Sequence, residues 1–458
     1  MSRSTKLLTF LTGASATCLL VAITPPTAAD PAADEVFTVS RAIPLPGTPP
    51  QSLVSFDISD VDPTLGLYAL GDRTNKAVDL IQTNNLAAGV TQLKENFAGA
   101  TGNNDTSGPD GVVFVNHKEV WVGDAPSRFW IIQVPPAAPN AQVFTVPNGT
   151  NKRVDEMCWD PDHNLVMMAN NADDPPFVSI YSTTGPVLRK QIIFDKTHLP
   201  NFFKDRASNG IEQCQYNHRR GKFFLAIPEI DGPGDNSVAG GVAVVDPISF
   251  EVEGVFPVNH QRCAGPQGMA IGPDPQILLG CNTPSGGKVL SAKPDDPGNH
   301  QFRTVIVDDQ NPSHIIKAFR NESGADMVWF NPGNGHYFLA RSNAGGGAGG
   351  PEPNQLLGVI DAIALKADPS VSLGVQGAPN NHSVAADPVT NLTIVPIGRN
   401  KDVCSQAPGA PAGIDATGCF AVFKAPSDGD DCIAEGAPVM EVNDEGPSFL
   451  RGKCRGND

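Results

Sequence analysis

After residue 29, the sequence has no apolar run long enough to cross a membrane, because a spanning helix needs about 20 mostly apolar residues. It also has no run of lysine and arginine, and its formal net charge is −17. A surface this negative repels phosphate backbones. We therefore expect neither a membrane span nor a nucleic-acid partner.

Several catalytic and metal-binding motifs are also missing. The chain has no GxSxG, HExxH or GxxxxGK[ST], so serine esterases, zinc proteases and nucleotide hydrolases have no local support. The absence of CxxCH and of paired CxxC excludes covalent haem and a zinc ribbon. Charged residues make up only 18%, whereas there are 46 glycines and 42 prolines. This composition favours many short strands joined by tight turns.

The first 29 residues have the order of a secretory signal. Arg3 and Lys6 precede an apolar run over residues 7–23, and small residues follow as far as Ala29. This pattern predicts a signal peptide over residues 1–29 and a secreted or periplasmic protein.

Eight cysteines are left once Cys18 is removed with this segment. An even number in an oxidising compartment predicts disulfides. The positions favour three pairs and leave a fourth: Cys263–Cys281, Cys404–Cys419, Cys432–Cys454 and, by remainder, Cys158–Cys214.

One pattern recurs seven times along the chain. Each copy has a polar residue, an apolar run, a turn, and a second run that ends in a small residue and a polar one; residues 108–124 are the clearest copy. Copies follow one another at intervals of 45 to 59 residues, which indicates a repeat architecture. The polar residues that open the copies, here called the anchors, are Asp57, Asp110, Asp155, Glu212, Gln267, Asp326 and His382.

Each copy offers about four short strand candidates, which is typical of a propeller blade. We therefore predict an all-β fold, a single β-propeller of seven four-stranded blades over residues 30–426, followed by a disulfide-clipped tail over residues 427–458. Six blades are the alternative, if the first copy is spurious. In the fifth copy the third and fourth strands are expected at residues 288–293 and 302–308.

The seventh copy lacks a fourth strand, and residues 35–46 form a strand-like segment without a partner. Pairing this segment beside residues 419–425 would close the ring and leave no exposed edge. The longest loops are expected together on one face, here called the loop face, which marks it as the binding face for a small-molecule substrate or a protein partner.

Each anchor begins the innermost strand of its blade, so the seven side chains are expected to meet near the axis on the loop face. Carboxylates this close cannot all ionise without a cation, so either a divalent ion is bound or protons are shared. The oxygen-rich set favours Ca²⁺. Its predicted ligands are Asp57, Asp110, Asp155, Glu212 and Gln267. A purely structural ring that ties blades together is the alternative.

The polar residues that end the second strands predict another ring outside the first. These side chains are expected to orient a polar ligand: Asp72, Asp124, Asn170, Asn282, Arg341 and Arg399. The tryptophans fall within strands and are expected to pack between blades. His117 lies in a turn at the opposite face, where an exposed side chain is expected.

Two frames carry a family resemblance. GPDGVVF at Gly108 and GPQGMAIGP at Gly265 resemble the inner-strand motif of SMP-30/gluconolactonase-like propellers, while the seven copies and HSVAADP at His382 resemble YVTN-type seven-bladed propellers. The first resemblance implies a metal-dependent hydrolase of lactones or related esters. Asp326 or His382 would then be the base that activates water. The alternative is a non-catalytic exported propeller that binds a ligand or a protein.

Overall fold

The computed structural model describes residues 35–134, 141–282, 303–320, 322, 324–342, 354–375, 381–425, 438–443 and 446–451. The predicted signal peptide and the predicted Cys432–Cys454 pair lie outside these residues. The account below concerns the unit that begins at Glu35.

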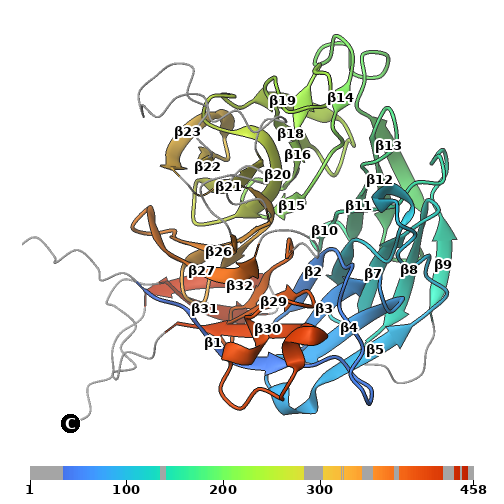
Figure 1. Ribbon diagram of the computed structural model, residues 1–458. Helices are drawn as coiled ribbons and strands as arrows, with labels where there is room; N and C mark the ends of the chain where they lie inside the picture. Colours follow the sequence, from blue (N-terminus) through green and yellow to red (C-terminus); the bar gives the residue numbers. More distant parts are fainter. Residues whose placement is uncertain are drawn as a thin grey trace, which may run out of the picture. The chain divides into compact units, whose positions relative to one another are not determined.

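Seven four-stranded antiparallel sheets form the blades of a propeller (Figure 1). Blades 1 to 3 consist of β2 (Ser59–Asp62), β3 (Leu67–Asp72), β4 (Ala77–Gln82) and β5 (Val90–Lys94); β6 (Val112–Val115), β7 (Glu119–Asp124), β8 (Arg128–Gln133) and β9 (Gln142–Thr145); and β10 (Met157–Asp160), β11 (Leu165–Asn170), β12 (Phe177–Ser182) and β13 (Leu188–Ile193).

Blades 4 to 6 consist of β15 (Cys214–Asn217), β16 (Lys222–Ile227), β18 (Gly241–Val245) and β19 (Val252–Pro257); β20 (Ala264–Ile271), β21 (Gln276–Asn282), β22 (Arg303–Asp308) and β23 (Asn311–Arg320); and β24 (Ala325–Asn331), β25 (His336–Arg341), β26 (Asn354–Asp361) and β27 (Lys366–Val375). Blade 7 consists of β28 (Ala385–Asp387), β29 (Leu392–Ile397), β30 (Cys419–Lys424) and β1 (Thr38–Ile43).

The remaining elements are short. Two small antiparallel pairs join β14 (Ala207–Ser208) to β17 (Glu229–Ile230) and β31 (Pro438–Asn443) to β32 (Gly446–Arg451). Four single 3₁₀ turns complete the described part of the chain: η1 (Leu86–Ala88), η2 (Asn104–Thr106), η3 (Cys404–Gln406) and η4 (Ile414–Ala416).

The seven first strands follow one another around a ring. Each of β2, β6, β10, β15, β20, β24 and β28 contacts the next, and β28 contacts β2. The ring of seven is therefore confirmed, and the six-bladed alternative is wrong.

Blade 7 joins the two ends of the propeller sequence. β1 runs antiparallel to β30, with Val39 opposite Phe423 and Ile43 opposite Phe420. This is the predicted closure, and it covers the edge that β30 would otherwise expose.

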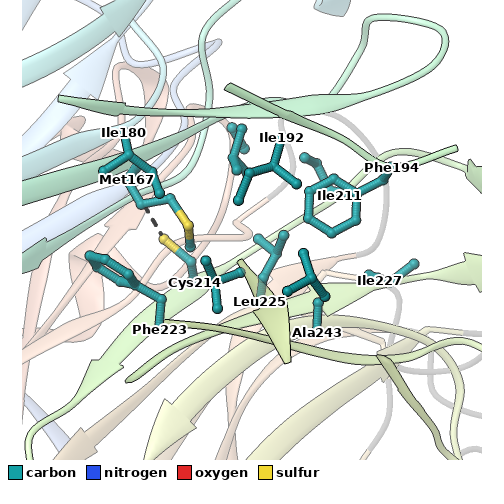
Figure 2. Packing of buried hydrophobic residues seen from close by; sticks show 14 of the residues in the cluster. Met167, Ile180, Ile192, Phe194, Ile211, Cys214, Phe223, Leu225, Ile227 and Ala243 are labelled. Atoms are coloured by element: carbon teal, nitrogen blue, oxygen red, sulfur yellow. Dashed lines mark hydrogen bonds between the residues drawn. The ribbon is translucent and has the colours of Figure 1, made fainter. Parts of the chain in front are cut away.

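The apolar side chains are buried between neighbouring blades. Figure 2 shows one such layer, in which Met167 and Ile180 of blade 3 face Phe223 and Leu225 of blade 4. Each of these four side chains is fully buried, and full burial of a side chain of this size contributes roughly 1.5–3 kcal/mol. The period-two alternation of the strands explains why each sheet can pack against a blade on both sides.

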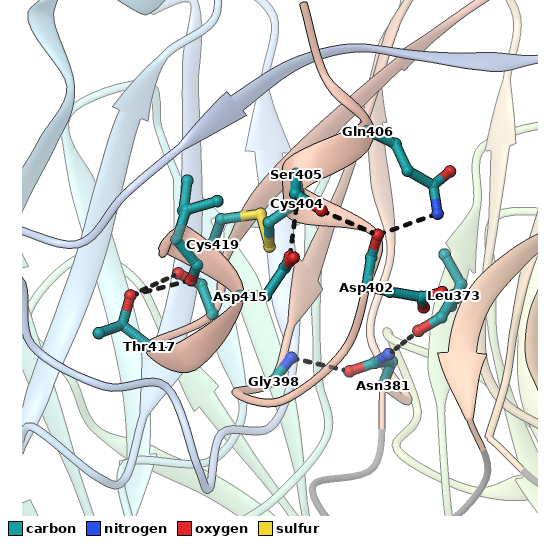
Figure 3. The surroundings of a disulfide bond; sticks show 12 residues. Leu373, Asn381, Gly398, Asp402, Cys404, Ser405, Gln406, Asp415, Thr417 and Cys419 are labelled. Carbon is teal, nitrogen blue, oxygen red and sulfur yellow. Dashed lines mark hydrogen bonds between the residues drawn. A yellow bond between two sulfur atoms is a disulfide. The ribbon is translucent and has the colours of Figure 1, made fainter. Parts of the chain in front are cut away.

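Three of the predicted disulfides are present: Cys158–Cys214, Cys263–Cys281 and Cys404–Cys419. The first links blades 3 and 4 within the core layer just described. The last holds the loop between β29 and β30, where the Asp415 carboxylate also accepts a hydrogen bond from the Ser405 amide at 3.0 Å (Figure 3).

The outer half of blade 5 differs from the prediction. Residues 302–308 were expected as the fourth strand, but β22 is the third, and β23 is the fourth. The expected third strand, residues 288–293, lies outside the described residues. Pro312 lies within β23. It is tolerated because β23 is the outermost strand of its blade, where a missing N–H breaks no inner ladder.

Candidate functional site

The anchors take equivalent backbone positions in successive blades. The amide of Asp57 donates to the carbonyl of Gly71 at 2.9 Å, and the amide of Asp155 donates to the carbonyl of Ala169 at 2.8 Å. In each case the acceptor is the small residue near the end of the second strand. This repeated bond fixes the anchor just ahead of its inner strand, at the loop-face end of the ring.

Six of the seven anchors line one cavity of about 360 Å³, here called the loop-face cavity. Its lining also includes Asn104, Arg153, Glu156, Asn282 and Ser342. The anchors on the cavity are Asp57, Asp155, Glu212, Gln267, Asp326 and His382. The seventh, Asp110, is fully buried beside it.

Asp110 does not line the cavity, unlike the other six anchors, because it is paired with Arg73. The guanidinium group of Arg73 forms ion pairs with both Asp57 and Asp110, and it also donates to the side-chain oxygen of Asn104. The Arg73 side chain is only 5% exposed. One buried cation therefore joins the anchors of blades 1 and 2.

Arg153 supplies a second buried positive charge. Its Nε donates to Asp155 Oδ2 at 2.7 Å, and the same oxygen accepts a bond from Asn171 Nδ2 at 2.6 Å. Two guanidinium groups thus lie among the anchors, where the sequence predicted either a divalent ion or shared protons.

His382 and Asp57 form a pair across blades 7 and 1. His382 Nε2 lies 2.9 Å from Asp57 Oδ1, and the imidazole is stacked on the ring of Phe56 with 5.6 Å between centroids. Burial opposes both charges, but the interactions with Arg73 and His382 hold the pKa of Asp57 below its usual range. Burial alone would lower the pKa of His382, but the interactions with Asp57 and Asp326 outweigh burial and raise it. Both shifts favour the ionic form of the pair.

Three other carboxyl groups line the cavity: Glu156, Glu212 and Asp326. The described residues give their carboxyl oxygens no hydrogen bond and no ion pair. Burial and the surrounding carboxylates raise the pKa of Glu156 and of Glu212 well above the usual range. Burial also raises the pKa of Asp326. These three groups hold protons more tightly than ordinary carboxylic acids.

Metal binding needs several ligands around one point. Within the described ranges, no group of three or more His, Cys, Asp or Glu residues is placed to hold a metal ion. Calcium stays a prediction that metal analysis tests.

Of the second predicted ring, Asn282 lines the cavity. Its Nδ2 donates to Gln267 Oε1 at 2.7 Å and so orients that anchor. Arg399 is exposed and is not among the lining residues.

The other four members of that ring are buried away from the cavity. Asp124, for example, accepts bonds from the Ala98 amide at 3.1 Å and from Arg128 Nε at 2.9 Å, which anchors the loop before β6. The remaining three bind nearby side chains: Asp72 accepts from Asn75, Asn170 donates to Asp173, and Arg341 pairs with Glu322.

Residues that are not anchors also tie blades together. Gln213, which follows an anchor, accepts the amides of Met269 and Val328 at 2.7 and 3.3 Å. At the opposite face Asp62 Oδ2 lies 2.8 Å from His117 Nδ1. The structural role considered for the anchors is therefore shared between these positions and anchors such as Asp57 and His382.

The sequence did not predict the roles of Arg73, Arg153, Glu156 and Asn104. A usable signal was present for two of them, because Arg153 and Glu156 flank an anchor within two residues. Arg73 reaches two anchors from the end of β3, which no local pattern reveals.

No protein-family model matches the sequence, and no curated protein is similar to it. Solved structures do share its fold, at 9–10% sequence identity. One is titled the crystal structure of the mitotic checkpoint complex, with a TM-score of 0.53 and 10% identity over 89% of this chain and 98% of that one. A second is the crystal structure of RRP9 WD40 repeats, with a TM-score of 0.54 and 9% identity over 85% and 100%. A third is the structure of U3-55K, with a TM-score of 0.53 and 10% identity over 86% and 99%.

These likenesses define the class: a seven-bladed β-propeller with WD40-type structural neighbours. No helix among the described residues is long and apolar enough to cross a membrane.

Proposed function

We propose that this chain is an exported β-propeller that binds a small hydrophilic cation in the loop-face cavity without transforming it. The observation that carries the proposal is that Glu156, Glu212 and Asp326 all line this cavity and that their carboxyl groups have no hydrogen bond or ion pair with the described residues. Binding of a partner is also suggested by the structural neighbours, one of which is the crystal structure of the mitotic checkpoint complex.

The charge around the cavity supports a cationic ligand. Its anchors, together with Asp110 and Glu156, carry six carboxyl groups. Arg73, Arg153 and His382 supply three positive groups, so three carboxyls have no cation. A buried negative charge without a partner is unfavourable. In the free protein protons fill this role, and a bound cation would replace them.

Export rests on two observations. The N-terminal 29 residues have the composition of a signal peptide, and three disulfides are present in the propeller. Stable disulfides are typical of oxidising compartments. Expression of the full chain with its N-terminal segment, followed by N-terminal sequencing of protein from the periplasm or medium, tests this part.

The cation could be a divalent metal ion or a primary ammonium group, and titration calorimetry distinguishes them. Calcium chloride is one probe; glucosamine is the other, with glucose as its uncharged match. We expect one of the two cations to bind, to release protons, and to bind more tightly as the pH rises. Glu212→Gln and Asp326→Asn should each weaken binding about tenfold, which corresponds to ~1.4 kcal/mol.

The control variant is Asp235→Asn, which removes an exposed carboxylate outside the cavity. It should bind like the unmodified protein. Equal binding by Glu212→Gln and the unmodified protein would contradict the proposal, as would the absence of binding by both cations. Elemental analysis of the purified protein reports any metal that is already bound.

The second candidate is hydrolysis of a lactone or related ester, and the His382–Asp57 pair favours it. A carboxylate that holds an imidazole beside a cavity is the arrangement that orients a general base toward water. Because the pKa of His382 is raised, this base would be neutral and active only on the alkaline side of its usual range. Asp326, on the same cavity, is the other predicted base.

A panel of lactones and esters tests this candidate. We expect turnover that rises with pH and is lost in both His382→Gln and Asp326→Asn, if hydrolysis takes place. Turnover that survives both substitutions would assign it to a contaminant or another site. Treatment with EDTA and readdition of Ca²⁺ tests the metal dependence that the family resemblance implies.

A further inference from the structure

A second cavity, of about 210 Å³, lies at the other end of the propeller axis. It is here called the turn-side cavity, because its lining comes from the inner strands β2, β6, β10, β15 and β24 and from the turns that follow them. Glu156 and Ile58 line both cavities. The two therefore lie back to back along the axis, and every residue that lines the turn-side cavity belongs to the described chain.

Aromatic rings are concentrated in this second lining. Trp159 and Trp329 are partly exposed there, whereas Trp121 is fully buried within its blade layer. The ring of His117 meets Trp159 edge to face with 5.6 Å between centroids. Phe114 and Tyr216 complete the aromatic part of the lining. Both also pack against apolar layers between blades, as expected: Trp159 against the layer of blades 2 and 3, and Trp329 against the layer of blades 7 and 1.

The charged groups on the turn-side cavity are almost all acidic. Asp60, Asp62 and Glu156 line it, together with His117, and neither lysine nor arginine is among its lining residues. Two of the carboxylates are held in place: Asp60 Oδ2 accepts the Phe114 amide at 2.7 Å, and Asp62 Oδ2 lies 2.8 Å from His117 Nδ1. The cavity is thus lined by aromatic rings and by acidic groups, and no lysine or arginine is among its lining residues.

We propose that the turn-side cavity binds a small molecule with an alkylammonium head group. The faces of tryptophan and tyrosine rings attract such cations, and they also provide apolar contact for the alkyl groups. Once ionised, the carboxyl groups supply a negative charge that no arginine of the lining offsets. The volume is below the roughly 300–1,000 Å³ of pockets for drug-sized ligands, so a head group rather than a large ligand fits.

This site differs in chemistry from the loop-face cavity and does not depend on the function proposed for it. There the lining is of carboxylates, amides and arginine, which suits a strongly hydrated cation. Here aromatic rings replace the amides and no guanidinium is present. A methylated ammonium, which is weakly hydrated, is the better match.

Choline and 3,3-dimethyl-1-butanol provide a matched pair of probes, since they have the same shape and differ in charge. Titration calorimetry with the full protein should show choline binding about tenfold or more tightly than the alcohol, equivalent to ~1.4 kcal/mol. Quenching of tryptophan fluorescence should accompany binding. Burial raises the pKa of Asp60 to about 7, so affinity should also increase between about pH 6 and pH 8 as Asp60, beside Asp62, Glu156 and His117, loses its proton.

Two variants locate the site. Asp60→Asn removes a carboxylate, and Trp159→Leu removes a ring; each should weaken choline binding about tenfold, within the range of a desolvated cation–π or ionic contact. Asp274→Asn, which neutralises an exposed carboxylate outside the cavity, should leave binding unchanged. If Asp60→Asn does not fold, Trp159→Leu decides alone.

The proposal is overturned if choline and the alcohol bind equally, because the cavity is then merely apolar. It is also overturned if neither binds, or if both variants bind choline like the unmodified protein. Choline binding that is lost in Glu212→Gln but kept in Trp159→Leu would assign the ligand to the loop-face cavity instead.

Discussion

His382 and Asp57 lie 325 residues apart in sequence, yet their side chains meet at 2.9 Å. They belong to the last and first blades, so the pair spans the junction at which the ring closes. Arg73 continues the contact from Asp57 to Asp110 in the second blade. One network of charged side chains therefore joins three consecutive blades at the loop-face cavity.

Replacement of His382 by glutamine should lower stability mainly on the acidic side of neutrality. A histidine with a raised pKa contributes stability that is complete below about pH 6.5 and is lost as the pH rises through its folded pKa. Asp57, with a lowered pKa, contributes above about pH 4 and loses its contribution as the pH falls further. A tenfold change in proton affinity between the folded and unfolded chain corresponds to ~1.4 kcal/mol of stability.

The midpoint of thermal unfolding checks this from about pH 4 to pH 9. The difference between the protein and His382→Gln should be largest near pH 5–6 and should shrink at high pH. His314→Gln, in a largely exposed position, is the matched control. A difference that does not change with pH would show that the imidazole contributes by packing alone.

Replacement of Arg73 by methionine should be strongly destabilising. It leaves Asp57 and Asp110 buried without their shared cation, and loss of one partner from a buried pair costs about 3–5 kcal/mol. Urea unfolding measures the change. Arg399→Met, at an exposed position, should change stability by less than ~0.5 kcal/mol. If both variants lost the same unfolding free energy, Arg73 would not be stabilising Asp57 and Asp110.

Replacement of Glu156 by glutamine should stabilise the protein at neutral and alkaline pH. A carboxyl whose pKa is raised by folding keeps its proton when the unfolded chain has lost it. Stability therefore falls as the pH rises above about 4.3 toward the folded pKa. Glutamine removes this penalty, so the thermal midpoint of Glu156→Gln should exceed that of the unmodified protein at pH 8 and match it near pH 4.

Glu251→Gln, at an exposed position, controls for the lost charge. If Glu156→Gln is less stable at every pH, the carboxylate must be ionised and satisfied in the folded protein, which would also weaken the case for a cation site beside it.

Two of the disulfides should differ in their contribution to the free energy of unfolding. Cys158–Cys214 closes 56 residues and Cys404–Cys419 closes 15. Loop-closure entropy predicts about 4 kcal/mol for the first and about 3 kcal/mol for the second. Urea unfolding of the double alanine variants should therefore show the larger loss for Cys158→Ala/Cys214→Ala. The reverse order would mean that folded-state packing, not chain entropy, sets the effect.

The sequence repeat predicted the fold because every blade has the same local sequence pattern. A polar anchor, an apolar run, a turn and a small residue fixed the inner two strands of every blade, and these are the buried strands with the strongest pattern. Prediction was wrong in the outer half of blade 5, because the partly exposed positions of β23 relax the pattern and Pro312 is tolerated at an edge.

The candidate site was predicted less completely, for a different reason. The position of an anchor depends on its own strand, so the sequence could predict that all seven would meet, and six of them line one cavity. Arg73 and Arg153 reach the same region with long side chains from neighbouring loops. Their direction depends on tertiary contacts that no period in the sequence records. A calculation of charge from the anchors alone therefore overstated the need for an added cation.

The pairing of β1 with β30 also governs the order of events during synthesis. Thr38 is paired with Lys424, so a growing chain on the ribosome carries an unmatched first strand until almost the whole propeller has emerged. Blades 1 to 6 are each continuous in sequence and can form as they appear, whereas the seventh must wait. A rearranged gene that moves residues 35–46 to follow residue 425 would turn this late long-distance step into a local hairpin, and the time needed for the ring to become protease-resistant should shorten.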